Sequence, residues 1–255
     1  GYIKRLQGLN SEAERIYQKS LTIFREIGFK NGESGMLSAL GHLAKYQGNF
    51  DDAEQLYRES LVIRREIGER KGEAGTLEKL GTIAIIRRNI AEAEQLYQDS
   101  LVAYQDIGDL VGEAELFRRL SDVAKLRNNL TDAEKFVQKS LAIYREIGDR
   151  KNEGYALNDL VAIAIDRLDG PEAYRLQQES LVIFREIGNI KMEASALGRL
   201  AVLENAGGDK AEAERLCRES LAILKNIGWR EQEANGLSIL GSIAKSRGDL
   251  AQAER

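Results

Sequence analysis

Apolar side chains recur along this chain with the period of an α-helix. Between residues 51 and 67 they return every three to four positions, which places them on one face of a helix. A second stretch, from Glu73 to Arg87, repeats this spacing and holds small residues at positions 74 and 81. The two stretches therefore predict two amphipathic helices. Their apolar positions are Ala53, Leu56, Tyr57, Leu61, Ile63 and Ile67 in the first and Leu77, Leu80, Ile83 and Ala84 in the second.

Each predicted helix ends at a residue or turn that interrupts it. Gly68 follows the stretch 51–67, and glycine adopts the left-handed conformation of a helix end at the lowest cost because it lacks a Cβ atom. The stretch 73–87 leads into the short turn RRNI at 87–90. The two helices are thus expected to form a hairpin of roughly 15 and 17 residues. We call helices equivalent to 73–87 first-type helices and helices equivalent to 51–67 second-type helices.

This pattern repeats every 40 residues without insertion or deletion. The phrase ESLVIRREIG at 59–68 has five near-copies elsewhere in the chain, and one serine marks each copy. The serines are Ser20, Ser60, Ser100, Ser140, Ser180 and Ser220. Other columns hold a single residue type in all six copies, and in the second copy they are Ala53, Leu61, Ile67, Gly68, Glu73 and Leu80.

One hairpin cannot bury its own apolar face, whereas stacked hairpins cover one another. The sequence therefore predicts an all-α solenoid of stacked antiparallel helix pairs, with about six 40-residue repeats in a single array. The expected units are 29–68, 69–108, 109–148, 149–188 and 189–228, with partial units at 1–28 and 229–255. YIKRLQG at 2–8 matches the end of a first-type helix, and AQAER at 251–255 matches the start of a second-type helix. We accordingly expect a piece cut from a longer array or multidomain protein.

The residues at the core of the hairpin resemble the tetratricopeptide repeat (TPR). Leu40 and Gly41, then Ala44, and then Ala53 with Tyr57 echo the L-G…A-x3-F pattern of that family. The usual repeat has about 34 residues, and the longer 40-residue version is similar to the repeats of kinesin light chain, of Pins-type scaffolds and of sensor regions in signalling ATPases. The resemblance implies a right-handed superhelix whose first-type helices line a concave groove that holds a peptide or a helix.

On the first-type helix, positions 35, 38, 42 and 45 fall on one face, and these columns vary from copy to copy. Position 38 and its equivalents hold Ser38, Glu78, Arg118, Asn158, Gly198 and Ser238. A face whose residues differ between repeats can determine which partner binds. We therefore place a partner-binding groove there, centred on repeats two to four. Its expected residues are Glu78, Ile85, Arg118, Arg119, Asp122, Lys125, Tyr155, Asn158, Asp159, Ile165 and Asp166.

Each type of side chain in this groove suggests a contact. Asn158 is expected to hold a backbone amide of the ligand through two hydrogen bonds. Arg118 and Lys125 are expected to meet a carboxylate, and Ile85 and Ile165 to seat apolar side chains. The Lys and Asn set of the chaperone-tail clamp is not assembled in these columns, so that class of partner is not expected.

Composition and charge exclude several classes of partner and site. With 37 basic and 41 acidic side chains the formal charge is −4, which provides no positive field for nucleic acid. No apolar run reaches the roughly 18 to 20 residues that cross a bilayer, so membrane insertion is not expected. His42 and Cys217 are the only residues of their types, which excludes an intrachain disulfide and a zinc cluster. We expect a cytoplasmic protein with a protein or peptide partner, without catalytic residues, metal or cofactor.

Several conspicuous side chains have a structural explanation. His42 is expected to be a plain polar surface residue and Cys217 a packing residue in a column of mostly aromatic residues. Glu73 and its equivalents are expected to favour the helix dipole and to cap free amides. The arginine column of Arg65 is expected to be merely solvated. Glu204 replaces a close-packed alanine, so the fifth repeat is expected to be locally loose or bent.

Two other functions remain open from the sequence. The chain could be a regulatory sensor arm of a larger signalling protein such as an ATPase, which the out-of-phase ends favour. It could also associate end to end, because terminal repeats expose the apolar surface that a neighbouring repeat would cover.

Overall fold

A computed structural model describes residues 2–248 of the chain, with side chains from residue 11 onward. All secondary structure in this range is α-helical, which confirms the predicted all-α class. The helices are α1 (Tyr2–Glu26), α2 (Lys30–Gln47), α3 (Phe50–Glu66), α4 (Arg70–Ile86), α5 (Ile90–Asp106), α6 (Leu110–Leu126), α7 (Leu130–Glu146), α8 (Arg150–Asp166), α9 (Gly170–Glu186), α10 (Ile190–Gly207), α11 (Lys210–Asn226) and α12 (Arg230–Arg247). Even-numbered helices are first-type and odd-numbered helices are second-type.

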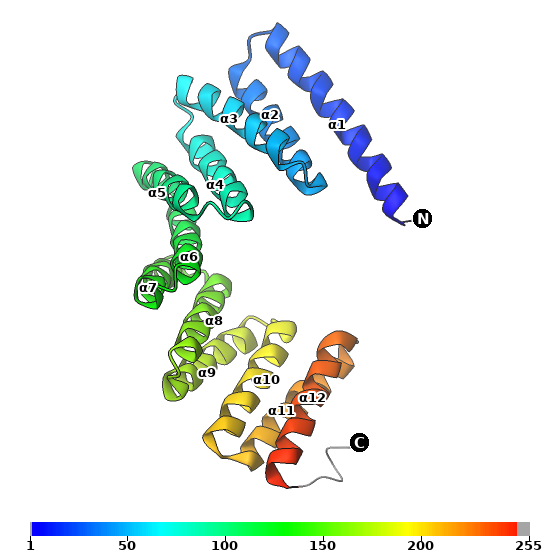
Figure 1. The fold of residues 1–255 in the computed structure, drawn as a ribbon, viewed down its shortest axis with the longest axis vertical. Coiled ribbons are helices and arrows are strands. Elements are labelled where there is room, and N and C mark those ends of the chain that lie inside the picture. Colours follow the sequence, from blue (N-terminus) through cyan, green and yellow to red (C-terminus); the bar gives the residue numbers. More distant parts are fainter. Residues whose placement is uncertain (1, 249–255) are drawn as a thin grey trace. The chain divides into compact units, whose positions relative to one another are not determined.

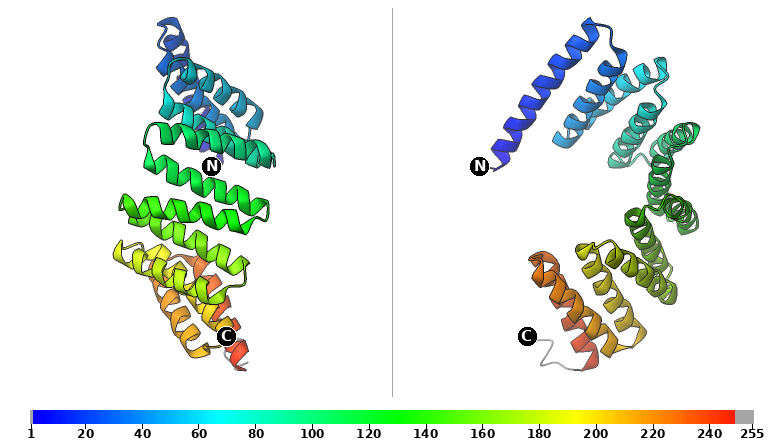
Figure 2. Two further views of the ribbon diagram at one scale, coloured as in Figure 1. Left: turned by 90° about the vertical axis from the view of Figure 1, so that its left-hand side faces the viewer. Right: turned by 180° about the vertical axis from the view of Figure 1, so that it is seen from behind.

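The chain divides into two compact units, residues 1–128 and 129–255, which we call unit 1 and unit 2. Unit 1 contains α1 to α6 and unit 2 contains α7 to α12. Within each unit, helices that follow one another in sequence pack side by side (Figures 1 and 2). The expected repeat 109–148 supplies the last helix of unit 1 and the first helix of unit 2.

First-type helices begin earlier than the apolar pattern indicated. α4 begins at Arg70 rather than near Glu73, because the Glu69 side chain caps it by accepting a hydrogen bond of 2.8 Å from the Gly72 amide. In α8 the equivalent cap is Asp149, which accepts from Asn152 at 3.0 Å. The extra turn is polar, so hydrophobic spacing alone does not reveal it.

The six glycines that follow second-type helices have the predicted left-handed conformation, with φ between +65° and +70°. The turns after first-type helices use the same conformation without requiring glycine. Arg88, Asn128 and Leu168 have φ of 61°, 57° and 61° there. Pro171 lies in the first turn of α9, which confirms that LDGPEA at 168–173 starts a helix.

The N-terminal segment departs from the prediction. Residues 2–8 do not form a separate first-type helix, because α1 runs without a break from Tyr2 to Glu26. In the later turns an asparagine or aspartate such as Asn89 caps the second-type helix, whereas the equivalent sequence position here is Leu9, whose residue type has no side-chain acceptor. The segment AQAER at 251–255 lies outside the described residues.

Small residues allow close approach of neighbouring helices, as the sequence indicated. A Cβ atom on Gly41 would lie 2.8 Å from the Tyr57 ring, and one on Gly81 would lie 2.5 Å from the Tyr97 ring. Both tyrosines are buried in unit 1. In unit 2 the equivalent column contains Cys217, which is fully buried and donates to the Gly236 carbonyl at 3.3 Å. The expected packing role of Cys217 is confirmed.

The serine of the repeated phrase ties the two helices of a hairpin together. At Ser60, Ser100, Ser180 and Ser220 the hydroxyl donates to a backbone carbonyl in the preceding first-type helix, for example from Ser100 to Ala74 at 2.8 Å and from Ser220 to Ala194 at 2.7 Å. Ser60 makes the same bond to Ser34 at 2.8 Å. The Ser140 hydroxyl is buried without a hydrogen-bond partner among the described residues. Where it forms, the bond satisfies a carbonyl and a buried hydroxyl together, which explains why serine recurs at this position.

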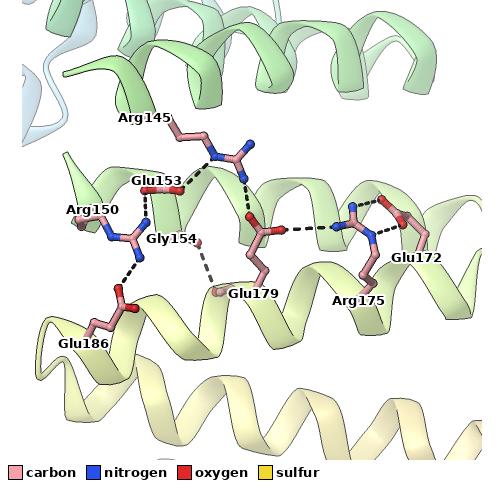
Figure 3. A network of polar contacts seen from close by, with 9 residues as sticks. Arg145, Arg150, Glu153, Gly154, Glu172, Arg175, Glu179 and Glu186 are labelled. Atoms are coloured by element: carbon pink, nitrogen blue, oxygen red, sulfur yellow. Dashed lines mark hydrogen bonds and ion pairs between the residues drawn. The ribbon is translucent and has the colours of Figure 1, made fainter. Parts of the chain in front are cut away.

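The repeated glutamates and arginines form ion pairs, contrary to the expectation that the arginine column is merely solvated. In unit 1, Glu73 accepts hydrogen bonds from Arg65 and Arg70, each at 2.8 Å. In unit 2, Glu153 accepts from Arg145 at 3.1 Å and from Arg150 at 2.6 Å (Figure 3). The glutamate side chains are only 8% and 5% exposed.

The same arginines also link both preceding helices to α9. Arg145 of α7 reaches Glu179 of α9, and Arg150 of α8 reaches Glu186 of α9 (Figure 3). Glu73 and its equivalents, which were expected to cap helices, therefore connect neighbouring helices instead. The capping is performed by residues such as Glu69.

Candidate partner-binding surface

In unit 1 the expected residues lie on α4 and α6, both first-type helices. Arg119 Nε is 3.5 Å from a carboxylate oxygen of Glu78, so this ion pair joins α6 to α4. Arg119 also pairs with Glu115 at 2.9 Å. The structure therefore brings Glu78 and Arg119 together as one feature of this face.

The remaining charges on α6 pair with one another along the helix. Arg118 lies 3.7 Å from Glu115, and Lys125 lies 2.7 Å from Asp122. Both Arg118 and Lys125 are half-buried, whereas Asp122 is exposed. A ligand carboxylate would compete with these intrahelical pairs, which are weak because they remain in contact with solvent.

Ile85 lies two turns from Glu78 on α4 and is half-buried. It is the apolar member of the expected face in unit 1. The face of unit 1 is therefore a set of compensated charges with an isoleucine at one end.

In unit 2 the expected residues lie on α8. Asn158 Oδ1 accepts hydrogen bonds from Gln177 Nε2 at 3.2 Å and from Ser180 Oγ at 2.9 Å. Because a carbonyl oxygen has two lone pairs, both acceptor positions are occupied. The expected two-bond contact with a ligand amide therefore does not fit this arrangement, which leaves the Nδ2 group of Asn158 to donate.

Tyr155 is held by an aromatic contact with α9. Its ring centroid lies 5.7 Å from that of Phe184, with the ring planes tilted by 58°. Asp159 is half-buried, and Asp166 is exposed at the end of α8. Tyr155 thus has one edge in the hairpin packing and is only partly available for a partner.

Ile165 is the expected residue of unit 2 that lies in a well-formed concavity. It is 45% exposed and lines a cavity of about 620 Å³ together with residues of α10, α11 and α12. On α10 the lining includes Ser195, Gly198 and Val202, which are the equivalents of positions 35, 38 and 42. The varied columns therefore share one face in unit 2, as predicted.

The expected groove, centred on repeats two to four, includes Ile165 but not the other residues that line this cavity. Trp229 and Arg199 also line it, but neither was among the expected site residues. One signal was present in the sequence, since Gly198 is the only glycine in a column that otherwise holds larger side chains. The missing side chain leaves a cavity because of the distance between α10 and α12. The pattern of residues along one helix does not predict that distance.

The three residues with potential chemistry have ordinary environments. His42 is exposed, consistent with a polar surface residue. Burial raises the pKa of the Cys217 thiol to about 11, which opposes formation of a reactive thiolate. Burial and a hydrogen bond with Glu204 raise the pKa of Tyr174, so the Glu204 carboxylate has a partner. The predicted looseness around Glu204 is a separate property and stays a prediction.

Two further properties concern the described residues alone. Between residues 2 and 248, no group of histidine, cysteine, aspartate and glutamate side chains is arranged to hold a metal ion. Over the same range no helix has the length and apolarity needed to cross a membrane.

Comparisons with known proteins support the fold. A family profile described as "Tetratricopeptide repeat" matches residues 1–66 and 72–146, and a second profile with the same description matches residues 194–227. No curated protein is similar in sequence to this chain.

Several solved structures are similar in fold at low sequence identity. BtubC (BKLC) from P. vanneervenii has a TM-score of 0.76 at 17% identity, covering 86% of this chain and 92% of that one. A STAND protein with a tetratricopeptide repeat sensor, PH0952 from Pyrococcus horikoshii, also has a TM-score of 0.76 at 17% identity, covering 94% of this chain but 36% of that one. The nearly identical TPR-like repeats assigned to a kinesin light chain of Podosopora anserina have a TM-score of 0.62 at 14% identity, covering 75% of this chain and 94% of that one.

Proposed function

Because this chain belongs to the tetratricopeptide repeat family, we propose that it is a non-enzymatic scaffold that binds a peptide segment or helix of another protein on its first-type helices. One observation carries the proposal. Most of the repeated columns are occupied by core contacts, serine bonds and ion pairs, whereas the residues of the varied columns, apart from the buried Ser38, lie half-buried or exposed on the first-type helices. The varied face is thus the surface on which one repeat can differ from the next without loss of the fold.

The charges on this face suit selection among partners. In unit 1, Arg118, Arg119 and Lys125 stand among Glu78, Glu115 and Asp122, so a partner with alternating charges can exchange intrahelical pairs for intermolecular ones. Such exchange affects specificity and association rate more than affinity, because the exposed pairs contribute little to stability. Asn158 Nδ2 adds a donor for a peptide carbonyl in unit 2.

A peptide-display selection against residues 1–255 tests the proposal. One variant replaces Arg118, Asp122, Lys125 and Asn158 with alanine. A matched control replaces four exposed residues of second-type helices, Arg15, Gln55, Gln95 and Lys135, with alanine. Peptides that enrich on the parent and on the control but not on the first variant support the proposal. Equal enrichment on all three proteins, or none on the parent, contradicts it.

A second candidate function is a regulatory sensor region within a larger signalling protein. The observation that favours it is the likeness to the STAND protein, since this chain covers 36% of a protein whose tetratricopeptide repeats are described as a sensor. The sequence that flanks this segment in its parent gene tests the idea. A nucleotide-binding domain in the same polypeptide is the expected result, and its absence contradicts the candidate.

A cytoplasmic location and end-to-end self-association stay predictions. Sedimentation velocity at increasing protein concentration tests the second of them, since a monomer at every concentration contradicts it.

A further inference from the structure

The cavity of unit 2 has a cause that lies in one residue of α10. In two other repeats, the side chain at the position of Gly198 reaches the serine of the following second-type helix. Ser38 Oγ lies 2.9 Å from Ser60 Oγ, and Asn158 Oδ1 accepts from Ser180 Oγ at 2.9 Å. Gly198 has no side chain to fill this space, and a Cβ atom there would meet only Ser220 Oγ, at 3.6 Å. The space is therefore open rather than closed by a tight contact.

The walls of the cavity are mainly apolar. Ile165 and Val202 line it and are 45% and 48% exposed, and Trp229 and Ile239 contribute from the start and the middle of α12. Its volume of about 620 Å³ falls within the roughly 300–1,000 Å³ of sites that enclose a whole ligand. Covering exposed branched side chains around a concavity with an apolar group lowers the free energy, because apolar surface is removed from water.

Arg199 is the charged residue among those that line the cavity. Arg199 lines the cavity, is exposed and has no ion pair with any of the described residues. Most arginines of the repeated columns differ in this respect, since residues such as Arg145 and Arg185 are bound by glutamates. Lys191 lies on the Trp229 ring, with its Nζ atom 5.4 Å from the ring centroid. An unpaired guanidinium beside an apolar concavity is suited to a carboxylate adjacent to an apolar group.

We propose that this cavity anchors the partner peptide through a bulky apolar side chain, while an adjacent aspartate or glutamate of the peptide pairs with Arg199. This inference rests on the proposed peptide-binding function and assigns its main anchor to unit 2. Gln232 and Asn235 also line the cavity, where Asn235 Nδ2 donates to Gln232 Oε1 at 3.4 Å, and their amides supply groups that can bond the peptide backbone.

Gly198 makes a direct test possible. Gly198→Leu fills the cavity, and it is compatible with the helix because Gly198 has no positive φ and its Cβ position is unobstructed. Gly198→Ala adds one methyl group and leaves most of the cavity open. Ala222→Leu is the matched control, since Ala222 is exposed on the second-type helix α11 and does not line the cavity.

The charge at the rim is tested independently. Arg199→Glu reverses it, and Arg88→Glu is the matched control because Arg88 is also exposed and has no ion pair with described residues. Peptides are selected from a random twelve-residue display library against the parent and each variant. Thermal unfolding of every variant establishes that differences in selection do not come from loss of the fold.

Trp229 provides a local readout, since it is the only tryptophan of the chain and lines the cavity. Titration of the enriched synthetic peptides is followed by Trp229 fluorescence. The expected peptides carry a bulky apolar residue next to an acidic one, and their binding changes the Trp229 fluorescence. Their Kd for Gly198→Leu should be at least about tenfold higher than for the parent. Ala222→Leu and Arg88→Glu retain binding. Gly198→Ala weakens it less than Gly198→Leu, and Arg199→Glu selects basic neighbours instead of acidic ones.

Other outcomes overturn the proposal in distinguishable ways. Peptides that bind the parent and Gly198→Leu equally leave the peptide-binding function in place and remove the cavity as its anchor. A parent that selects no peptide contradicts both. If the free carboxylate 3-phenylpropionate binds as tightly as the selected peptides, the cavity is a small-molecule site and the peptide assignment is wrong.

Discussion

Gly81 in unit 1 and Gly198 in unit 2 are both helical glycines on first-type helices, yet the space beside them is used in opposite ways. The Tyr97 ring occupies the space at Gly81, where a Cβ atom would be 2.5 Å away. At Gly198 the nearest atom would be 3.6 Å away, and a cavity opens instead. A missing side chain thus permits a tight helix contact at Gly81, where the Tyr97 ring fills the space, and leaves an open cavity at Gly198, where no side chain does.

The largest expected effect comes from adding a methyl group at the tight contact. Gly81→Ala forces the Tyr97 ring to move, so we expect the free energy of unfolding to fall by about 2 kcal/mol. Urea unfolding followed by circular dichroism measures it. A variant as stable as the parent would mean that the ring relaxes freely and that the contact is not close-packed.

A smaller and equal effect is expected in both units from the shared ion-pair column. Glu73→Gln in unit 1 and Glu153→Gln in unit 2 each remove a buried carboxylate that accepts two arginine hydrogen bonds. Each substitution should cost about 1 kcal/mol of unfolding free energy, since the arginines remain partly solvated. Glu172→Gln, in an exposed pair with Arg175, is the control and should cost about 0.3 kcal/mol. A large difference between Glu73→Gln and Glu153→Gln would show that the units differ in more than their binding faces.

The same column predicts a loss of stability in acid. Hydrogen bonds from Arg25 lower the pKa of Glu33, despite an opposing effect of burial. For Glu73, burial raises the pKa, but hydrogen bonds from Arg65 and Arg70 outweigh it, so the pKa is lowered from 4.5. Since the folded pKa is below the unfolded one, the contribution is complete above about pH 4.5 and is lost as the pH falls through the folded value. Urea unfolding between pH 6 and pH 3 should show a shallower acid loss for Glu73→Gln than for the parent, and parallel curves would contradict the pairing.

The smallest expected effect is a gain. Gly198→Ala improves helix propensity without a steric conflict, so the free energy of unfolding should rise by about 0.5 to 1 kcal/mol. Gly81→Ala and Gly198→Ala should therefore change the free energy of unfolding in opposite directions. A loss of stability in Gly198→Ala would mean that the space beside it is not open.

Much of the fold was predictable because it depends on local patterns. The 40-residue period and the position of Gly68 fixed the helix pairs and their order, since both act through neighbouring residues. The early start of α4 was not predictable from apolar spacing, because a polar residue, Glu69, caps it. The break expected after residue 8 is absent for a related reason, since no capping residue stands at position 9 and α1 continues through it.

The candidate site was predictable as a face but not as a shape. The spacing of the varied columns placed Ile165 and Gly198 on the same side of their helices, and both line the cavity. The bonds that Asn158 makes to Gln177 and Ser180 depend on side chains 19 and 22 residues away, which a single-helix pattern does not contain. Trp229 enters the cavity only because α12 packs beside α10.

The central claim is that a partner binds on the first-type helices, with its anchor in the cavity of unit 2. Methyl NMR of isoleucine-labelled protein tests it most directly, because isoleucines are present on both kinds of surface. On addition of a selected peptide, the methyl signals of Ile165 and Ile239 should shift while those of Ile107 and Ile187, at the ends of second-type helices, stay in place. Shifts confined to Ile107 and Ile187 would contradict the account.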